Sequence, residues 1–250
     1  MSKITVDETL PIPMHYQLYE ILLNRIKTNE WSVNQKIPTE RELCDLFKVS
    51  RITVRQALSV LAKEGYLYRK QGRGTFVTLP RIEQPLNQFY SFSDAIRKLG
   101  YKAKSIILSF DCIPCPIGIS QQLRIPEGDT LYRIKRLRLA DSEPFAVETS
   151  YVPQALCEGL VSADIETMGL YEALRVKGNL NVQLGEESIE AILIPADDAG
   201  ILHVKKNAAG LYLERLAGTE DLQVEFCTTL IRGDRYKYKI ILGKSRLSGL

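Results

Sequence analysis

The sequence predicts an α+β protein in two parts, a helical N-terminal part and a larger C-terminal part built on an antiparallel sheet. Up to about residue 63, apolar residues recur at helical spacing, whereas beyond residue 90 strand patterns alternate with short helical ones. Charge divides the chain in the same way. Residues 1–80 hold 12 Lys and Arg against 8 Asp and Glu, whereas residues 81–250 hold 21 against 22. A basic first part and a near-neutral remainder fit one unit that meets a polyanion and one that does not.

Composition excludes several other classes of protein. The 250 residues contain no uncharged apolar run near the roughly 18 to 20 residues of a membrane span, and the N-terminus lacks a signal-peptide core. We therefore expect a cytoplasmic protein without a membrane partner. The five scattered cysteines do not resemble a disulfide framework. Cys112 and Cys115 have CxxC spacing, but Pro114 and Pro116 resist the helix that would activate a redox thiol, so we expect no metal and no cofactor.

Three helices are predicted in the N-terminal part. The first covers residues 14 to about 29, where apolar residues form one stripe. The second begins after Thr39, which together with Glu42 has the spacing of a capping box. The third runs from residue 51 to about 63 behind Ser50, a favourable N-cap residue. Two helices joined by a tight turn are typical of a helix-turn-helix, whose second helix lies in the DNA major groove.

The start of the third helix carries the side chains that such a groove requires. At about 100° per residue, Ile52 lies opposite the apolar face, with Arg51 and Arg55 on one flank and Thr53 also placed away from the core. Arginine can hydrogen-bond guanine or phosphate, hydroxyls reach phosphates, and an aliphatic side chain can contact a thymine methyl. The alternative is a solvated helix face without a partner.

A hairpin follows the third helix. In YLYRKQGRGTFV, two short β-prone runs flank a glycine-rich tip that carries Arg73, which has the form of a wing entering the minor groove. Arg41 begins the second helix and could reach the phosphate backbone. The cap, the helix spacing and the basic wing occur together in one segment, and this combination favours DNA binding over a solvated face.

The sequence divides into a DNA-binding domain over residues 9–78, a proline-containing linker with a hinge over 79–90, and a second domain over 91–250. Consecutive hairpins in the second domain imply an antiparallel sheet with flanking helices. The predicted helices lie near residues 93–99, 117–123, 169–176 and 197–204. The predicted strands lie near residues 104–110, 130–152 (a hairpin turning at 141–144) and 187–194, and three more lie within 210–231 and 236–242.

Arg136 and Arg138 lie on the same face of one predicted strand, because side chains alternate with period two. Two neighbouring cations are unfavourable unless an anion or acidic groups lie between them. Glu148 on the returning strand could form an ion pair with one of them. An anion site and an internal ion-pair ladder both remain open from spacing alone.

The segments PTERELC, VSRITVRQAL and LAKEGYLYRKQGRGTFV resemble the winged helix-turn-helix of the GntR superfamily of bacterial transcription regulators. This resemblance implies that the chain binds a near-palindromic double-stranded DNA operator as a homodimer. It also implies DNA contacts from Arg41, Arg51, Thr53, Arg55, Gly72, Arg73 and Gly74. Helix geometry adds Ser50 and Ile52 to the candidate DNA-binding residues.

The segments YSFSDAIRKLG, RIKRLRLADSEPFAVETSYVP, GLYEAL and IRGDRYKY resemble the effector-binding UTRA domain of the HutC subfamily, whose fold is related to chorismate lyase. In members that sense sugar phosphates, close in pattern to those that regulate N-acetylglucosamine use, the two arginines hold the phosphate. The resemblance implies an anion site at Ser91, Arg136 and Arg138, and contacts to the rest of the effector from Glu148, Tyr151, Tyr171, Glu225 and Tyr236. At Gly169 and Ile231 this chain lacks a serine and a tyrosine of those members.

We therefore expect a DNA-binding regulator, a repressor, controlled by a small anionic effector such as a sugar phosphate or amino-sugar phosphate. One alternative is a chorismate-lyase-like enzyme fused to a DNA-binding domain. A second is a regulator that senses a non-phosphorylated metabolite, and a third is an architectural DNA-binding protein without a ligand. No common hydrolase, nucleotide-binding or zinc-protease motif occurs, and the only histidines are His15 and His203, so no catalytic residue is predicted.

Overall fold

The computed structural model describes residues 5–78, 80–85, 89–98 and 100–240. The chain forms two compact units, an N-terminal unit of residues 1–81 and a C-terminal unit of residues 82–250. The division falls inside the segment predicted to be a linker.

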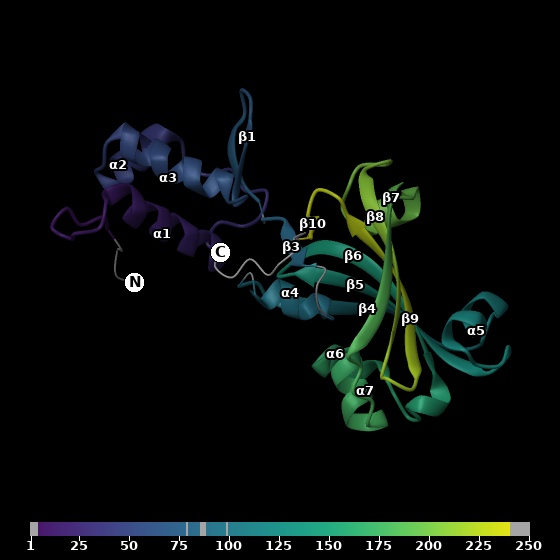
Figure 1. Ribbon diagram of the computed structural model, residues 1–250. Coiled ribbons are helices and arrows are strands. Elements are labelled where there is room, and N and C mark those ends of the chain that lie inside the picture. The colour runs from purple at the N-terminus through teal and green to yellow at the C-terminus, as the bar shows by residue number, and fades with distance from the viewer. Residues whose placement is uncertain (1–4, 79, 86–88, 99, 241–250) are drawn as a thin grey trace, which may run out of the picture. The chain divides into compact units, whose positions relative to one another are not determined.

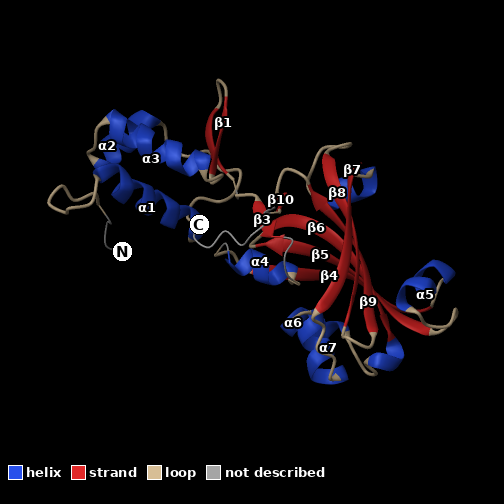
Figure 2. Ribbon diagram, viewed as in Figure 1, coloured by secondary structure: helices blue, strands red, loops and turns tan. Residues whose placement is uncertain are grey.

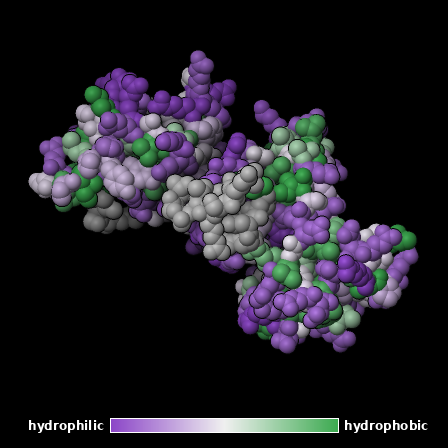
Figure 3. All heavy atoms as spheres, in the orientation of Figure 1, coloured by the Kyte–Doolittle hydropathy of each residue, from purple (hydrophilic) through white to green (hydrophobic). Residues whose placement is uncertain are grey.

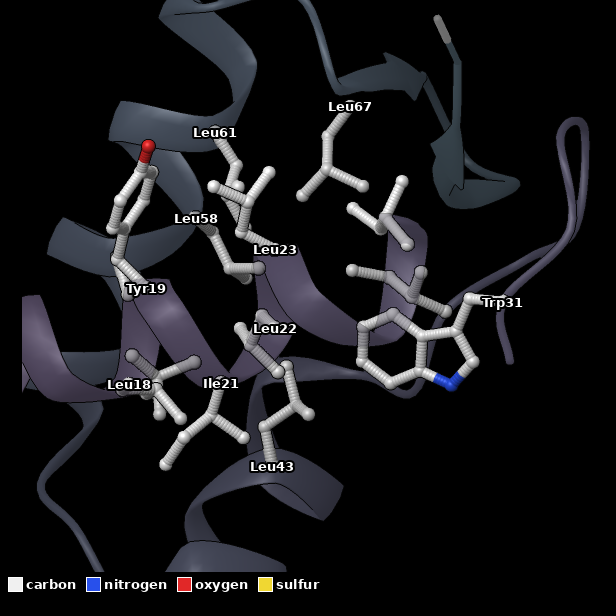
Figure 4. Close-up of a cluster of buried hydrophobic side chains, with 14 of the residues drawn as sticks. Leu18, Tyr19, Ile21, Leu22, Leu23, Trp31, Leu43, Leu58, Leu61 and Leu67 are labelled. Carbon is white, nitrogen blue, oxygen red and sulfur yellow. The ribbon is translucent and has the colours of Figure 1, made fainter. Parts of the chain in front are cut away.

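The N-terminal unit consists of three helices and a two-stranded antiparallel hairpin (Figure 1). Its elements are α1 (Met14–Lys27), α2 (Glu40–Phe47), α3 (Arg51–Lys63), β1 (Leu67–Lys70) and β2 (Gly74–Val77). The apolar stripe of α1 packs against α3, and Leu22, Leu43 and Leu61 are completely buried between the helices (Figure 4). Trp31, the only tryptophan of the chain, is buried in the same core.

Local signals fix the turn between α2 and α3. The capping box is confirmed: the backbone N–H of Thr39 donates to the Glu42 carboxylate at 2.6 Å, and the backbone N–H of Glu42 donates to the Thr39 hydroxyl at 3.3 Å. Lys48 ends α2 in the left-handed region at φ 56°. Ser50 then caps α3 by accepting from the backbone N–H of Thr53 at 3.2 Å. Short-range hydrogen bonds therefore set the direction in which α3 leaves the turn.

The C-terminal unit is centred on a six-stranded antiparallel sheet of order β4-β5-β6-β9-β8-β7 (Figure 2). Its strands are β4 (Ala103–Pro114), β5 (Thr130–Ala140), β6 (Glu143–Pro153), β7 (Leu184–Leu193), β8 (Ala209–Gly218) and β9 (Gln223–Arg232). Its helices are α4 (Phe92–Lys98), α5 (Ile117–Leu123), the 3-10 helix η1 (Gln154–Leu156), α6 (Ser162–Met168), α7 (Leu170–Gly178) and α8 (Ala196–Ile201). The predicted long hairpin corresponds to β5 and β6, and its turn includes Asp141 at φ 52°.

The sheet has two different faces. One face carries Ile134 and Val152, which pack with α6 and α7 in a single core cluster. The other carries Val147 and Leu230, which pack with α8. Because side chains alternate along each strand, Arg136, Arg138 and Glu148 share the first face. The polar cluster predicted from the sequence therefore lies on the same side of the sheet as α6 and α7.

The predicted linker and the last predicted strand differ from the observed structure. Residues 82–85 form strand β3 (Ile82–Pro85), which pairs in parallel with β10 (Tyr236–Lys239) in a separate two-stranded sheet. Glu83 contacts Lys237 at 2.6 Å and Lys239 at 2.8 Å across this pair. A four-residue strand with one buried aliphatic residue has no detectable periodicity, and its partner lies about 150 residues away. Strand β10 ends at Lys239, so Ile240 is not part of it, and residues 241 and 242 of the predicted 236–242 strand lie outside the described residues.

Other features expected from composition can also be located. The five cysteines are free thiols, and Cys112 and Pro114 lie within strand β4. In the described part of the chain, no cluster of three or more His, Cys, Asp and Glu side chains could hold a metal ion. None of the helices described here combines the length and the apolar composition of a membrane span.

Candidate functional site

The exposed face of α3 carries the arginines that the sequence places at a DNA surface. The side chains of Arg51 and Arg55 are 76% and 64% exposed, and Ile52 is 71% exposed between them. In Figure 3, hydrophilic side chains gather over α2, α3 and the β1–β2 hairpin. Ile52, Arg55, Gln56, Ser59, Ala62 and Arg69 line a shallow hollow on this surface. An exposed aliphatic side chain between two cations, such as Ile52, could contact a thymine methyl at the edge of a base pair.

One carboxylate joins these arginines. The Glu40 side chain at the start of α2 lies 3.2 Å from Nε of Arg51, 3.4 Å from Nη2 of Arg69 and 4.0 Å from Nε of Arg55. Sequence reasoning missed Glu40 and Arg69. Their contact joins positions 29 residues apart on α2 and β1, and only the three-dimensional fold reveals it.

Thr53 lies differently from the prediction. It is buried, and its hydroxyl lies 2.9 Å from the hydroxyl of Ser50. The expectation that Thr53 faces away from the core was wrong, because residue 53 adjoins the buried positions Val54 and Ala57 on the helix surface. Its hydroxyl is occupied at the cap, whereas Ser50 itself is exposed.

The hairpin has the predicted basic tip. Gly72 and Gly74 have φ values of 68° and 120°, a backbone conformation that favours glycine. A Cβ at Gly74 would lie 2.6 Å from Cε of Lys36, so a side chain there would have to displace that lysine. Arg73 is exposed between the two glycines, and Arg41 is exposed on α2. These four residues lie at the surface, where a duplex could reach them.

The C-terminal unit contains a cavity of about 520 Å³ on the α6–α7 side of its sheet. Strands β5, β6, β8 and β9, the start of α7, and residues 89–94 contribute its walls. Seven of the eight predicted effector residues line it: Ser91, Arg136, Arg138, Glu148, Tyr171, Glu225 and Tyr236. The volume suits a metabolite of the size of a sugar phosphate.

Glu148 holds both arginines of the R-x-R strand. Its Oε1 accepts from Nη1 of Arg138 at 2.9 Å and is in contact with Nη2 of Arg136. Arg136 also donates to Ser150 at 3.0 Å. All three ionised side chains are buried. The sequence predicted an ion pair between Glu148 and only one of the two arginines. The internal ion-pair interpretation therefore accounts for part of the cluster.

The cluster retains unused hydrogen-bonding capacity. The Nε–H groups of Arg136 and Arg138 are buried and have no hydrogen-bond partner among the described residues. A buried donor without an acceptor is costly, and such groups are often completed by a ligand, an ion or water. The two guanidinium groups thus retain donors that their contacts with Glu148, Ser150 and Ser93 do not use.

Electrostatics keep the cluster charged. Burial alone would raise the pKa of Glu148, but the neighbouring charges of Arg136, Arg138 and Arg215 lower this pKa to about 2. Glu148 therefore remains ionised at neutral pH. With two guanidinium groups against one carboxylate, Arg136, Arg138 and Glu148 together carry one excess positive charge.

The serines near the cavity have separate partners. Ser91 accepts from the backbone N–H of Asp94 at 3.1 Å and donates to its carboxylate at 2.8 Å, as a residue at a helix start does. Ser93 instead accepts from Nη2 of Arg138 at 2.9 Å. The same guanidinium lies over the ring of Phe92, with Cζ of Arg138 5.0 Å from the centre of that ring. The predicted Ser91 and the unpredicted Ser93 both line the cavity, and Ser93 is the one that contacts an arginine.

A second polar group lies deeper along β9. The Tyr171 hydroxyl donates to the Glu225 carboxylate at 2.7 Å, and Glu225 is 1% exposed. Burial and the adjacent Glu225 charge raise the pKa of Tyr171 well above its ordinary value, so its hydroxyl stays protonated. Tyr236 is buried and stacks on Phe92 with ring centres 6.4 Å apart. The cavity thus combines cationic, acidic and aromatic walls.

Tyr151 is the predicted effector residue that lies elsewhere. On β6 it has the opposite parity to Glu148 and Ser150, so it faces the other side of the sheet. There it stacks on Phe226 and joins the apolar cluster beside α5. The resemblance-based assignment of Tyr151 to the effector site was therefore wrong for this structure.

Arg215 is a cavity residue that sequence reasoning missed. Its guanidinium lies 2.6 Å from the Glu187 carboxylate and 4.4 Å from the ring centre of Tyr90. It also donates to the backbone carbonyl of Tyr90 at 3.2 Å. The alternation of β8 could have placed Arg215 on the cavity face, but only after the register with β9 was known.

Gly169 and Ile231, the two positions at which the sequence differs from members that sense sugar phosphates, also lie at the cavity. Gly169, at φ 88°, precedes α7 and lines the wall, as does Ile231 on β9. A glycine supplies no hydroxyl and an isoleucine supplies no ring. The cavity therefore has fewer side-chain groups for an anion at the start of α7 than the resembled members have.

Comparison with known proteins matches both units. Residues 15–77 match the family of bacterial regulatory proteins named gntR, and residues 98–237 match the UTRA domain. The chain is 31% identical to the HTH-type transcriptional repressor NagR of Bacillus subtilis, over 94% of this chain and 97% of that one. It is 27% identical to the mannosyl-D-glycerate transport/metabolism system repressor MngR of Escherichia coli, over 92% and 95%. The crystal structure of PhnF from Mycobacterium smegmatis matches with a TM-score of 0.72 and 25% identity, over 91% of this chain and 100% of that one.

Proposed function

Because this chain belongs to the gntR family of bacterial regulatory proteins and carries a UTRA domain, we propose that it is a transcriptional repressor released from DNA by a small anionic effector. The effector class we propose is a sugar phosphate or amino-sugar phosphate. The chain is a transcription regulator and not an enzyme, since NagR and MngR are repressors by name and match over nearly its whole length.

The proposed DNA contact is made by α3 and the wing. Arg51, Ile52 and Arg55 are exposed together behind a capped turn, and this arrangement presents them to the major groove. Arg73 at the hairpin tip would reach the adjacent minor groove. We propose that the chain acts as a homodimer on a near-palindromic operator, because one copy presents one recognition helix and two half-sites require two.

One observation supports an anionic effector above the others: Arg136 and Arg138 are buried in the wall of a cavity, and each retains a buried Nε–H without a partner among the described residues. Phosphate accepts several hydrogen bonds from arginine in well-defined geometry. The effector would then favour one arrangement of the paired DNA-binding units, which shifts the population away from the arrangement that fits both half-sites.

A second candidate is a non-phosphorylated effector. Glu148 already contacts both arginines, and the serine and tyrosine expected at positions 169 and 231 are absent. Such a cavity could instead hold a ligand carboxylate at Arg136 and Arg138, or a neutral polyol against Glu225 and Tyr171. The two candidates differ in whether the phosphate group is required.

A paired ligand panel tests the proposal. The operator is first selected from a randomised duplex library with the purified full chain. Amino-sugar, hexose and disaccharide phosphates, each beside the same sugar without phosphate, are then screened by thermal shift. We expect a phosphorylated sugar to raise the melting temperature and its unphosphorylated partner not to do so. Equal shifts from both partners would favour the second candidate, and failure to select any duplex would contradict a DNA-binding function.

A further inference from the structure

Glu40 is an acidic residue in the middle of a surface proposed to bind a polyanion. Its side chain is 24% exposed, and it lies among Arg51, Arg55 and Arg69, which come from α3 and β1. A carboxylate at such a position repels phosphate and weakens binding to any DNA sequence. Its presence on this surface therefore calls for a compensating function.

Stability explains this position only in small part, because the charge of Glu40 in the first turn of α2 favours that helix only modestly. The three arginine partners have side chains 57–76% exposed, and ion pairs at such exposure contribute little to folding. Capping of α2 does not require Glu40 either, because Thr39 and Glu42 form the capping box. Asp45 lies on the same helix and also adds a negative charge, but it has no contact with an arginine among the described residues.

The atoms that Glu40 contacts indicate its function. Glu40 accepts a hydrogen bond from Nε of Arg51 at 3.2 Å, and it lies 4.0 Å from Nε of Arg55, at the limit of an ion pair. Nε is the nitrogen nearest the stem of each side chain. The Nη groups of these two arginines make no hydrogen bond among the described residues. A guanidinium fixed at Nε directs its two Nη groups outward, and these can donate to guanine or to a phosphate.

We infer that Glu40 is a positioning residue for DNA recognition, which orients Arg51 and Arg55 for specific contacts and couples them to the wing strand through Arg69. This inference rests on the proposed function, since it concerns how the same surface reads DNA. Glu40 lowers the affinity for DNA of any sequence by its charge, and it raises the affinity for the operator by holding the arginines in place. The first effect leaves the ratio of operator affinity to non-specific affinity unchanged, because it acts on every sequence, and the second effect raises this ratio.

Three variants separate orientation from charge. Glu40→Asp keeps the charge but shortens the side chain, Glu40→Gln removes the charge at nearly the same shape, and Asp45→Asn removes a charge from the same helix without an arginine contact. Dissociation constants are measured by fluorescence anisotropy for the duplex selected by the wild-type chain and for a scrambled duplex of equal composition, at one fixed salt concentration.

We expect Glu40→Asp to lower the ratio of affinities by about five- to tenfold, through weaker operator binding with scrambled binding within about twofold of wild type. Glu40→Gln is expected to tighten binding to both duplexes through loss of the charge, and to lower the ratio less than Glu40→Asp does, because the amide oxygen at nearly the same position still accepts from Nε of Arg51. Asp45→Asn is expected to leave the ratio unchanged. In an Arg51→Ala background, Glu40→Asp is expected to cost less operator affinity than in the wild type, which a merely structural function of Glu40 would not produce.

Two results would overturn the inference. One is a Glu40→Asp variant with the wild-type ratio, which would show that only the charge matters. The other is an equal loss of ratio in Asp45→Asn, which would show a general charge effect. A wild-type chain that binds both duplexes equally would instead contradict the proposed function itself, so the two failures are distinguishable.

Discussion

The two units contain the same arrangement, a single glutamate among arginines, in opposite environments. In the N-terminal unit, Glu40 lies among arginines that are mostly exposed. In the C-terminal unit, Glu148 lies between Arg136 and Arg138 in a cavity wall, where all three are buried. Both clusters contain the same charged groups, but the cluster around Glu40 is exposed to water and the cluster around Glu148 is not.

The difference determines what each glutamate does. Breaking an ion pair that is exposed to water costs little free energy. An exposed glutamate can therefore orient arginines and still release them to a phosphate or a base. In a buried cluster, removing the carboxylate leaves two uncompensated cations in a medium of low polarity. The exposed arrangement thus suits exchange with DNA, and the buried arrangement suits a preformed site for one small anion.

The largest expected effect is from Glu148→Gln. It leaves Arg136 and Arg138 without the carboxylate that contacts both of them, and we expect it to destabilise the C-terminal unit by about 3–5 kcal/mol. Urea unfolding followed by circular dichroism should show an earlier transition for the sheet. The fluorescence of Trp31, which lies in the N-terminal core, should keep its wild-type midpoint.

Glu225→Gln is the control for this prediction. Glu225 is also a buried carboxylate of the C-terminal unit, but its hydrogen-bonded partner is the neutral Tyr171. We expect a smaller loss of stability. Equal midpoints for Glu148→Gln and the wild type would show that the two environments do not differ as described.

Arg55→Ala tests the exposed arrangement. Loss of a bidentate contact to a base costs about 1–3 kcal/mol, so we expect operator affinity to fall about 10- to 100-fold, which removes specific binding. Effector-induced thermal shift should be unchanged. Lys63→Ala, at the far end of the same helix, removes one positive charge as a control. Normal operator binding by Arg55→Ala in a gel shift would exclude α3 as the recognition helix.

Arg138→Ala tests the buried arrangement from its cationic side. Loss of charge-assisted hydrogen bonds to an anion costs about 1.5–3 kcal/mol, so effector affinity measured by calorimetry should fall about 10- to 100-fold. Operator affinity without effector should stay within about twofold of wild type. Arg133→Ala, on the opposite face of β5, is the matched control. Undiminished effector affinity would remove Arg138 from the site.

Ile52→Ala should have the smallest effect. The side chain is 71% exposed, so the melting temperature should not change. If Ile52 contacts a thymine methyl in the operator, the lost apolar contact should weaken operator binding by about five- to tenfold, measured by fluorescence anisotropy. A variant that binds the operator as tightly as the wild type would leave the exposed isoleucine without a function in recognition.

Much of the N-terminal unit could be predicted from the sequence because its signals are local. The Thr39–Glu42 capping box, the Ser50 cap and the glycine-flanked Arg73 all lie within a few residues of their partners. Thr53 was placed on the wrong face because successive residues are about 100° apart around the helix axis, and Thr53 borders the core face. The contact between Glu40 and Arg69 could not be predicted, because it depends on how the wing packs beside α2.

In the C-terminal unit the strands of the six-stranded sheet and the β5–β6 hairpin were predictable, whereas strand β3 and the pairing of distant strands were not. Alternation placed Arg136, Arg138 and Glu148 on one face of the β5–β6 hairpin. The parallel β3–β10 pair joins segments too short and too distant to leave a periodic signal. Strand parity also excludes Tyr151 from the cavity, an inference that the sequence allowed once Glu148 had been placed on the same strand.

Operator release by a defined ligand pair tests the central claim most directly. Fluorescence anisotropy of the selected operator, bound to the wild-type chain, is measured while a sugar phosphate from the panel or the same sugar without phosphate is added. We predict that only the phosphorylated sugar releases the operator and that the Arg138→Ala variant stays bound at the same concentrations. Equal release by the two sugars, or wild-type release from Arg138→Ala, would contradict control by an anion held at the buried arginines.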